Sequence, residues 1–501
     1  MFTFLVIKRK KQKKRKEKEI MNITAIRTPL TSFYGNFKHP QLVDHPDNFN
    51  VLEPEVTLAN VKEEAQRCLT CKTPRCVEAC PNHNPIPMFI KAVKEDDITK
   101  AGEILRSTQS FPSCSRICFH KCEDACVRGI KGEPVEIDKI ERYIGDNTVD
   151  KPITAPDTGK KVGIIGGGPA GLTAAKELRK KGHEVHIFES NPEVGGVLRY
   201  GIPSFRLPKD SFEKEINYLK DNGVKFHTRT EVGTDIKADD LRKMGIDALF
   251  ICSGTGKPRK LNVRGEDLKG VETSHTFLKR VKLAEKKSEL YDIGNKVIVI
   301  GGGNVAMDAA RSAIRLGSKK NPKDVEIVYR RSENEMPARK NEITDAKEEG
   351  IKFDYLLAPV KVLSEADMAE YGQCSKQNPS FDKVGGVKFE IMELSDPDES
   401  GRRSIVPTGK FVRKEADTVI VALGNMPKSV IKSGFEKDGI FITADNKGQV
   451  EINKDLQTSV DGIFAGGDVA PTGGLTLTDA IAAGRKAADS IDTYLKNLDN
   501  Q

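Results

Sequence analysis

One pattern occurs twice in this chain and restricts its fold more than any other feature. An apolar strand, a glycine-rich turn, a helix and a second strand run through KVGIIGGGPAGLTAAKELRKKGHEVHIFES at 161–190, and the same order recurs from 296 to 332. Glycines in such a turn let main-chain N–H groups approach a phosphate at the positive end of the helix. We therefore expect an α/β fold with two Rossmann-type domains, the second inserted into the first.

The first turn has the spacing of a complete dinucleotide site. The motif Gly166-x-Gly168-x-x-Gly171 follows the strand, with Pro169 at the start of the helix. Glu189 ends the second strand, where an acidic side chain accepts hydrogen bonds from an adenosine ribose. A strand, a turn, a helix and an acid in this order favour a nucleotide site over a structural loop.

The C-terminal segment indicates that this first nucleotide is FAD. The sequence TSVDGIFAGGDVAPTGGLTLTDAIAAGR, residues 458–485, resembles the second FAD signature of two-domain flavoproteins. In those proteins the aspartate of the GD pair, here Asp468, binds the ribityl chain, and the helix opening near Thr478 points at the flavin. The loop GGVLRYGIPSFRLP at 195–208 resembles a flavin-lining loop. Further cofactor-site candidates are Gly196 and Arg206 in this loop, Gly467 before Asp468, and Gly424.

The second turn predicts NADPH. Its site candidates are Gly301, Gly303, Asn304 and Ala306. Alignment of VEIVYRRS with VHIFES puts Tyr329 where Glu189 stands, and Arg330 and Arg331 follow. Because a carboxylate is missing and two guanidinium groups are present, a ribose with a 2′-phosphate is preferred. Arg339, in the same loop, is a further candidate for this phosphate.

Eight of the ten cysteines fall in two groups of four upstream of these domains. The first group is Cys68, Cys71, Cys76 and Cys80, and the second is Cys114, Cys118, Cys122 and Cys126. Disulfides would need an oxidising compartment, and zinc would need closed tetrahedral sets. The run C-x2-C-x4-C-x3-C-P is close to that of bacterial ferredoxins, so two [4Fe–4S] clusters are the favoured interpretation. Of the two other cysteines, Cys252 is expected in the core and Cys374 in a polar loop.

The order of these motifs resembles the small subunit of NADPH-dependent glutamate synthase. The resemblance rests on the CxxC-x4-C-x3-CP run, IERYIGD, GGGPAG, GGVLRYGIPSFRLP, GGGNVAMD and YRRSENEMPA, and covers the chain from about residue 30 onward. The same module resembles the N-terminal part of dihydropyrimidine dehydrogenase and the FAD/NADP(H) subunit of bifurcating ferredoxin:NADP⁺ transhydrogenase. The resemblance implies electron transfer from NADPH through FAD and two clusters to an acceptor.

The resemblance also implies that the clusters are wired across the two cysteine groups. One cluster would take Cys68, Cys71, Cys76 and Cys126. The other would take Cys80, Cys118 and Cys122 with a fourth ligand, for which Glu141 is preferred and Cys114 is the alternative.

Other functions are disfavoured by what the sequence lacks. No CxxC lies in the second nucleotide domain and no CxxxxC follows GGVLRYG, so the redox dithiols of related disulfide reductases are missing. We identify no catalytic side chain, because the cofactors carry the chemistry. The expected partners are NADPH and a large subunit or another electron acceptor, such as a ferredoxin, a sulfur species or a small molecule.

The charge of the chain is concentrated at one end. Residues 1–20 hold nine Lys/Arg and two Glu, out of a net charge of +8 for the whole chain. The near-neutral body predicts neither nucleic-acid binding nor a basic patch for an acidic ferredoxin.

No apolar run has membrane-spanning length, so we expect a cytoplasmic protein without a membrane span. We expect four parts in the chain: a basic disordered tail at 1–20, a helical two-cluster domain at 21–150, an FAD domain at 151–288 and 426–501, and an NADPH domain at 289–425.

Overall fold

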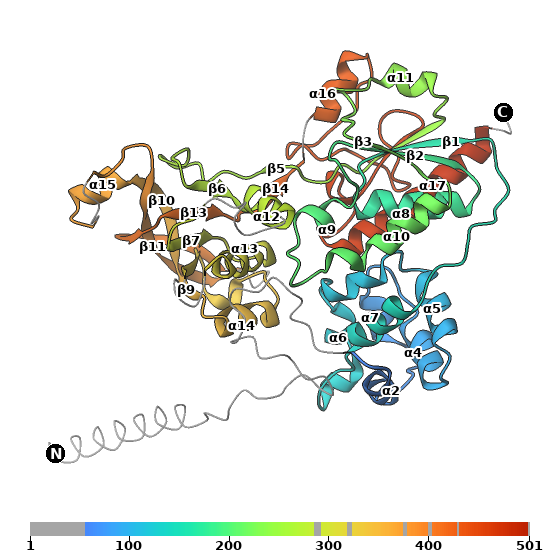
Figure 1. The fold of residues 1–501 in the computed structure, drawn as a ribbon, viewed down its shortest axis with the longest axis horizontal. Coiled ribbons are helices and arrows are strands. Elements are labelled where there is room, and N and C mark those ends of the chain that lie inside the picture. Colours follow the sequence, from blue (N-terminus) through green and yellow to red (C-terminus); the bar gives the residue numbers. More distant parts are fainter. Residues whose placement is uncertain are drawn as a thin grey trace.

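The computed structural model describes residues 56–284, 292–317, 323–373, 378–398, 403–427 and 430–498. They form a helical region and two α/β domains (Figure 1). The predicted basic tail at 1–20 and Cys374 lie outside the described residues. Within these ranges no helix combines the length and the apolar composition that a bilayer crossing requires.

The helical region carries the cysteines. Its helices are α2 (Leu58–Gln66), α3 (Arg75–Ala79), α4 (Ile86–Lys94), α5 (Ile98–Arg106), η2 (Pro112–Arg116), α6 (Lys121–Asp124), η3 (Val127–Ile130) and α7 (Ile137–Asn147). Thr57 starts α2 by accepting a hydrogen bond from the N–H of Asn60, and Asp97 does the same for Lys100 at α5. The apolar faces of α2, α4, α5 and α7 share one core, which includes Phe89 and Ile140.

The FAD domain predicted from the first glycine turn is a five-stranded parallel sheet. The strand order is β15-β4-β1-β2-β3. The bounds are β1 (Lys161–Ile165), β2 (Glu184–Glu189), β3 (Lys225–Thr228), β4 (Ala248–Ile251) and β15 (Ile463–Ala465). Its helices are α8 (Pro169–Lys180), α9 (Val197–Tyr200), η4 (Lys209–Ser211), α10 (Glu213–Asp221), α11 (Ala238–Lys243), α16 (Val430–Lys437), η7 (Gly467–Val469) and α17 (Leu477–Leu498).

Helices α8 and α17 of this domain pack together closely. A Cβ at Gly484 of α17 would stand 2.3 Å from the main-chain oxygen of Ala170 in α8. Only glycine fits there, so the C-terminal helix is held against the helix that follows the phosphate turn.

The NADPH domain predicted from the second turn repeats this plan. Its sheet has the order β6-β13-β7-β8-β9, with bounds β6 (Val271–Thr273), β7 (Lys296–Ile300), β8 (Asp324–Tyr329), β9 (Lys352–Tyr355) and β13 (Thr418–Val421). An antiparallel sheet, β10 (Leu357–Ser364), β11 (Val384–Pro397) and β12 (Arg403–Glu415), extends it. The helices are α12 (Ser274–Leu283), α13 (Asn304–Arg315), η6 (Glu333–Glu335), α14 (Lys340–Glu348) and α15 (Glu365–Glu370).

The domain boundary differs from the expected one. Strand β6 pairs with β13 in the second sheet, and Phe277 and Leu278 of α12 lie in its core. The NADPH domain therefore draws on residues before the expected start at 289. The chain crosses between the two α/β domains on a two-stranded antiparallel link, β5 (Lys257–Pro258) with β14 (Asn425–Met426).

The helical region is joined to the FAD domain by shared core and buried charge. Phe111 and Ile117 pack in the core of the FAD domain. Arg106, which is 4% exposed, pairs with Asp150 at 2.9 Å and with Glu215 of α10 at 3.1 Å. These contacts fix the cysteine region against the flavin half of the molecule.

Candidate cofactor sites

The structure brings together four cysteines from both sequence groups around one small cavity of about 30 Å³. Its cysteine lining is Cys68, Cys71, Cys76 and Cys126, the set that the resemblance implies for one cluster. The α3 segment supplies Cys76, and Cys126 comes from the turn before η3. Burial, with the charges of Cys126 and Cys68 adding to it, raises the pKa of Cys76 to about 11. Four thiols that converge on one point are suited to a positively charged metal centre, which would favour their thiolate forms.

The second predicted set is also assembled. Burial is the main cause of a raised pKa at Cys80, and the charges of Glu141 and Cys118 add to it. Burial likewise raises the pKa of Cys122, where Cys118, Glu141 and Cys80 all contribute. These four groups are thus within electrostatic reach of one another, although they come from three separate segments.

Glu141 lies in this group as a buried carboxylate. It belongs to α7 and is 7% exposed, and its Oε1 accepts a hydrogen bond from Nε2 of Gln109 at 3.2 Å. Burial raises its pKa to about 7. A carboxylate held at this point is consistent with the preferred fourth ligand, and Gln109 is a supporting residue that the sequence did not reveal. The side chain of Cys114 lies outside the described residues.

Polar groups around Cys80 fit an iron–sulfur cluster. The main-chain N–H groups of Asn84 and Asn82 are directed at its sulfur and favour the thiolate. The carboxamide of Asn82 is buried, at 2% exposure, and neither its nitrogen nor its oxygen has a partner. N–H donors to cluster sulfur are a normal feature of such sites. The two sets of soft ligands and these donors therefore fit two [4Fe–4S] clusters.

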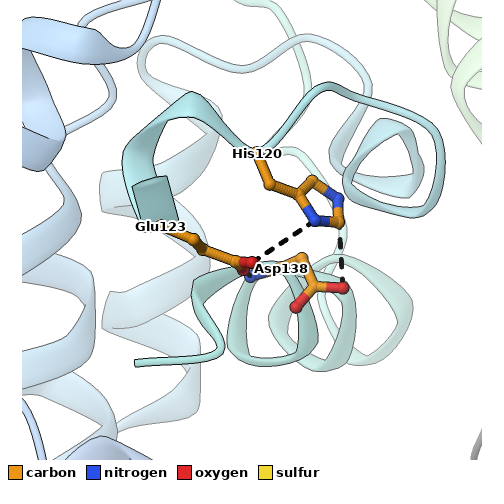
Figure 2. Close-up of side chains that lie close together, drawn as sticks. All are labelled: His120, Glu123 and Asp138. Carbon is orange, nitrogen blue, oxygen red and sulfur yellow. Dashed lines mark hydrogen bonds and ion pairs between the residues drawn. The ribbon is translucent and has the colours of Figure 1, made fainter. Parts of the chain in front are cut away.

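A triad of charged side chains, drawn in Figure 2, follows Cys118 and Cys122 along the chain or lies beside them in α7. The side chains of His120, Glu123 and Asp138 converge, with His120 Nδ1 3.4 Å from a Glu123 oxygen and His120 Nε2 3.9 Å from an Asp138 oxygen. Burial opposes the charged imidazole, but Cys118, Glu123 and Asp138 outweigh it and raise the pKa of His120. Lys139 lies 2.7 Å from Asp138. The triad is thus already balanced by a neighbouring cation.

The first dinucleotide turn has the geometry that a pyrophosphate needs. Gly166 has φ +114°, and a Cβ at Gly171 would stand 2.1 Å from the Gly166 oxygen. Gly196, at φ +52°, faces Gly168 across the turn, where a Cβ would stand 2.8 Å from the Gly168 Cα. Glu189 ends β2, and its Oε2 accepts from the N–H of Gly167 at 2.9 Å. The predicted residues of this turn therefore lie together, and the open side of Gly168 offers room for a phosphate.

The predicted second part of the FAD site lies at the start of α17. Gly467 has φ +68°, and burial, with the charge of Asp479 adding to it, raises the pKa of Asp468 to about 6. Thr478 is buried, with its hydroxyl 3.0 Å from that of Thr476. Asp479, which no sequence motif indicated, therefore adds a second carboxylate close to Asp468.

The second turn repeats this geometry with a different strand end. Gly301 has φ +152°, and a Cβ at Gly302 would stand 2.6 Å from the ring of Tyr329, the residue aligned with Glu189. Arg330 is exposed, and Nε of Arg331 is buried without a partner. The pair therefore places two guanidinium groups at the strand end, where the 2′-phosphate is predicted. Gly303, Asn304 and Ala306 open α13 as predicted.

Three predicted residues make other contacts. The Arg206 guanidinium is buried against the NADPH domain, 2.8 Å from Asp308 and 2.7 Å from Glu342. Gly424 has φ +81° on the interdomain link, and its carbonyl accepts from Arg259 at 3.0 Å. Arg339 donates to the helical region. In this structure these residues thus join domains, and partners such as Asp308 could be found only from the fold. Cys252 is buried, as predicted.

Family comparisons agree with this arrangement. Residues 160–487 match the model of the pyridine nucleotide-disulphide oxidoreductases. Residues 45–153 match that of dihydropyrimidine dehydrogenase domain II, described as a 4Fe-4S cluster domain. Both the predicted α/β half and the predicted cysteine half therefore match known families.

Two curated relatives cover most of the chain. The glutamate synthase [NADPH] small chain of Escherichia coli is 34% identical over 481 residues, which are 92% of this chain and 96% of that protein. The NADP(+)-dependent formate dehydrogenase subunit beta of Moorella thermoacetica is 36% identical over 455 residues, 85% of this chain. The chain spans 60% of the length of that subunit.

A solved structure supports the fold alone. Mycobacterium tuberculosis FprA in complex with NADPH matches with a TM-score of 0.54 at 18% identity, over 68% of this chain and 86% of that one.

Proposed function

Because the chain belongs to the pyridine nucleotide-disulphide oxidoreductases, among the relatives of the glutamate synthase [NADPH] small chain, we propose that it is the electron-input subunit of a larger enzyme. It is an NADPH-dependent oxidoreductase of the flavin and iron–sulfur type. When bound, FAD accepts a hydride from NADPH and the clusters carry single electrons onward. The proposal concerns the destination of those electrons, a large subunit that forms glutamate from glutamine and 2-oxoglutarate.

The observation that carries the proposal is the position of the second cysteine set between the two nucleotide domains. Arg485 of α17, from the FAD domain, donates to the main-chain oxygen of Asn82 at 3.2 Å. Arg339, from the NADPH domain, donates to the main-chain oxygen of Cys118 at 2.9 Å. The cavity of the first set has no residue of either nucleotide domain in its lining. This arrangement supports a second set that would hold the cluster nearer the nucleotide domains and a first set that would hold the outer cluster.

The residues of the chain then have separate tasks. The glycine turns and helix starts bind pyrophosphates, and Arg330 with Arg331 selects the 2′-phosphate. The thiols and Glu141 hold iron. Buried contacts such as Arg106 with Glu215 keep the helical region fixed on the FAD domain. No described side chain is required to move a proton during hydride transfer.

The test is anaerobic purification followed by three assays. We expect one FAD and about eight irons per chain, and oxidation of NADPH with an uncharged quinone. Addition of a glutamate synthase large subunit should give glutamate formation that depends on NADPH. Absence of iron, or a chain that neither binds the large subunit nor supports glutamate formation, would contradict the proposal.

A second candidate follows from the relative in Moorella thermoacetica. That protein is a formate dehydrogenase subunit, and this chain spans only part of it. The same module therefore occurs with another partner, and a stand-alone NADPH:acceptor oxidoreductase or a transhydrogenase subunit is the alternative. Activity with a ferredoxin and none with the large subunit would favour this alternative.

A further inference from the structure

The first cysteine cavity opens beside exposed apolar side chains. Leu69, which lies between two cysteines and lines the cavity, is 60% exposed. Met88 follows the lining residue Pro87 and is 60% exposed, and Ile130, in η3 after Cys126, is 68% exposed. Large apolar side chains exposed beside a functional cavity are typical of a surface that another protein covers.

The same two cysteine segments carry exposed positive charge. Lys72, Arg75, Arg128 and Lys131 are exposed, and within the described ranges none of them has an ion-pair partner. The segments 67–76 and 125–132 contain no aspartate or glutamate. Arg75 and Arg128 line the cavity itself, together with Leu69. The near-neutral composition of the body averages over this local group of cations.

We propose that these residues form a docking surface for an acidic protein electron acceptor, whose carboxylates meet the four cations while an apolar centre covers Leu69. The inference rests on the proposed function, because it assigns the outer cluster as the exit for electrons. We name the surface the exit face: Leu69, Lys72, Arg75, Met88, Arg128, Ile130 and Lys131. Steering by opposite charge would raise the association rate, and the apolar centre would hold the complex.

Charge excludes two other occupants. Residues 1–20 of this chain are strongly basic and would be repelled by the exit face. A second copy, related by a two-fold axis, would bring the same cations together. An acidic partner is the occupant that satisfies both the charge and the apolar exposure.

The test compares carriers of opposite charge. The probes are a strongly acidic [2Fe–2S] ferredoxin, the basic protein cytochrome c and the uncharged quinone menadione, each reduced with NADPH by the full chain. The test variant is Lys72→Glu/Lys131→Glu, which changes the two exposed cations that do not line the cavity. We expect kcat/KM for the ferredoxin to fall at least tenfold, activity with menadione to stay within twofold, and activity with cytochrome c to rise.

A matched control uses the carboxylates just outside these segments. Glu78, Asp124 and Glu133 are exposed and do not line the cavity. The variant Glu78→Gln/Asp124→Asn/Glu133→Gln should leave the rate with the ferredoxin unchanged or raise it. The single substitution Leu69→Asp tests the apolar centre. We expect it to slow reduction of the ferredoxin without changing the iron content.

The outcomes are distinguishable. If the unmodified protein does not reduce menadione with NADPH, the proposed function is overturned rather than the exit face. Two results would overturn the exit face alone: menadione activity without reduction of the ferredoxin by the unmodified protein, or menadione activity with an unchanged ferredoxin rate in both the double variant and Leu69→Asp at full iron content. In the unmodified protein, raising salt from about 50 mM to about 300 mM should slow the ferredoxin reaction, because screening weakens exposed charge pairs.

Discussion

Arg339 of the NADPH domain donates from Nη1 to the main-chain oxygen of Cys118 at 2.9 Å, and so touches a predicted cluster ligand from another domain. Its Nη2 lies 2.9 Å from Nδ1 of His120. Its own main-chain N–H donates to Oδ1 of Asn304, in the NADPH phosphate turn, at 2.9 Å. One residue thus connects the nucleotide turn with the second cysteine set, which explains why the guanidinium is not available for the 2′-phosphate.

Replacing Arg339 should therefore affect the domain contact more than the choice of nucleotide. In Arg339→Ala the contact with His120 and the bond to the Cys118 oxygen are lost, and a hydrogen bond from a charged donor such as the latter is worth about 1.5–3 kcal/mol. We expect slower reduction of the clusters by NADPH, measured by stopped-flow absorbance, with the KM ratio of NADPH to NADH unchanged. Arg339→Lys should restore part of the rate. A selective rise in KM for NADPH would instead indicate that Arg339 binds the 2′-phosphate.

The opposite result is expected for the pair that follows Tyr329. Arg330→Ala/Arg331→Ala should raise KM for NADPH by about 10-fold to 100-fold, because one or two charge-assisted bonds to phosphate are lost. KM for NADH should change little, since its ribose carries no phosphate. Steady-state assays with menadione measure both constants. Equal changes for the two nucleotides would contradict the assignment.

Iron content tests the fourth ligand of the second set. Cys114→Ser should keep about eight irons per chain and an unchanged spectrum, whereas Glu141→Ala should lose about four. The physical reason is the position of the Glu141 carboxylate, buried within reach of Cys80 and Cys122. Gln109→Leu is a milder variant, which removes the hydrogen bond to Glu141 and should weaken retention of iron without abolishing it. The reverse pattern, with loss at Cys114→Ser and none at Glu141→Ala, would make the cysteine the ligand.

Local sequence patterns predicted the parts of the fold that depend on neighbouring residues. Short segments such as 161–190 determine each glycine turn, the strand before it and the helix after it. The alignment of Tyr329 with Glu189 holds because both end the second strand of a unit with the same strand order. The inserted arrangement also follows from sequence, since one βαβ unit lies between two parts of the other.

Contacts between distant segments were not visible in the sequence. Strand β6 pairs with β13, about 150 residues later, so its place in the second sheet depends on tertiary packing. Arg206 stands in a flavin-lining motif, yet Asp308 and Glu342 bind it from the other domain. The exit face is a similar case, because it brings together cations from separate segments, whereas the net charge is a sum over the whole chain.

The buried charges between the helical region and the FAD domain should matter for stability. Arg106→Met leaves Glu215 without its closest cation, and breaking a buried pair in this way costs about 3–5 kcal/mol. Lys91→Met, which breaks an exposed pair with Glu95, should change the free energy of unfolding by less than about 0.5 kcal/mol. Urea unfolding followed by flavin fluorescence measures both. Equal effects of the two variants would show that the Arg106 contacts do not hold the domains together.

Lys282 should make stability depend on pH in the alkaline range. It is 4% exposed in α12, and its amine donates to the main-chain oxygen of Leu207 at 3.0 Å. Burial, helped by Lys209 and Arg199 and opposed by Asp308, lowers its pKa to about 7. An unfolded lysine titrates near pH 10.4, so between about pH 7 and pH 10 the unfolded chain binds a proton that the folded chain does not.

The free energy of unfolding contributed by this group therefore rises with pH across that window, and the cost of the buried cation is fully present below it. Removing the amine should therefore raise the free energy of unfolding more at pH 7 than at higher pH. We expect Lys282→Met to be more stable relative to the unmodified protein at pH 7 than at pH 10, because the unmodified protein loses its penalty as the amine becomes neutral. Lys282→Arg stays charged, so its free energy of unfolding should fall increasingly below that of the unmodified protein as pH rises. Thermal unfolding at each pH measures both differences, and a gap between Lys282→Met and the unmodified protein that stays constant from pH 7 to pH 10 would show that the folded chain keeps this lysine charged.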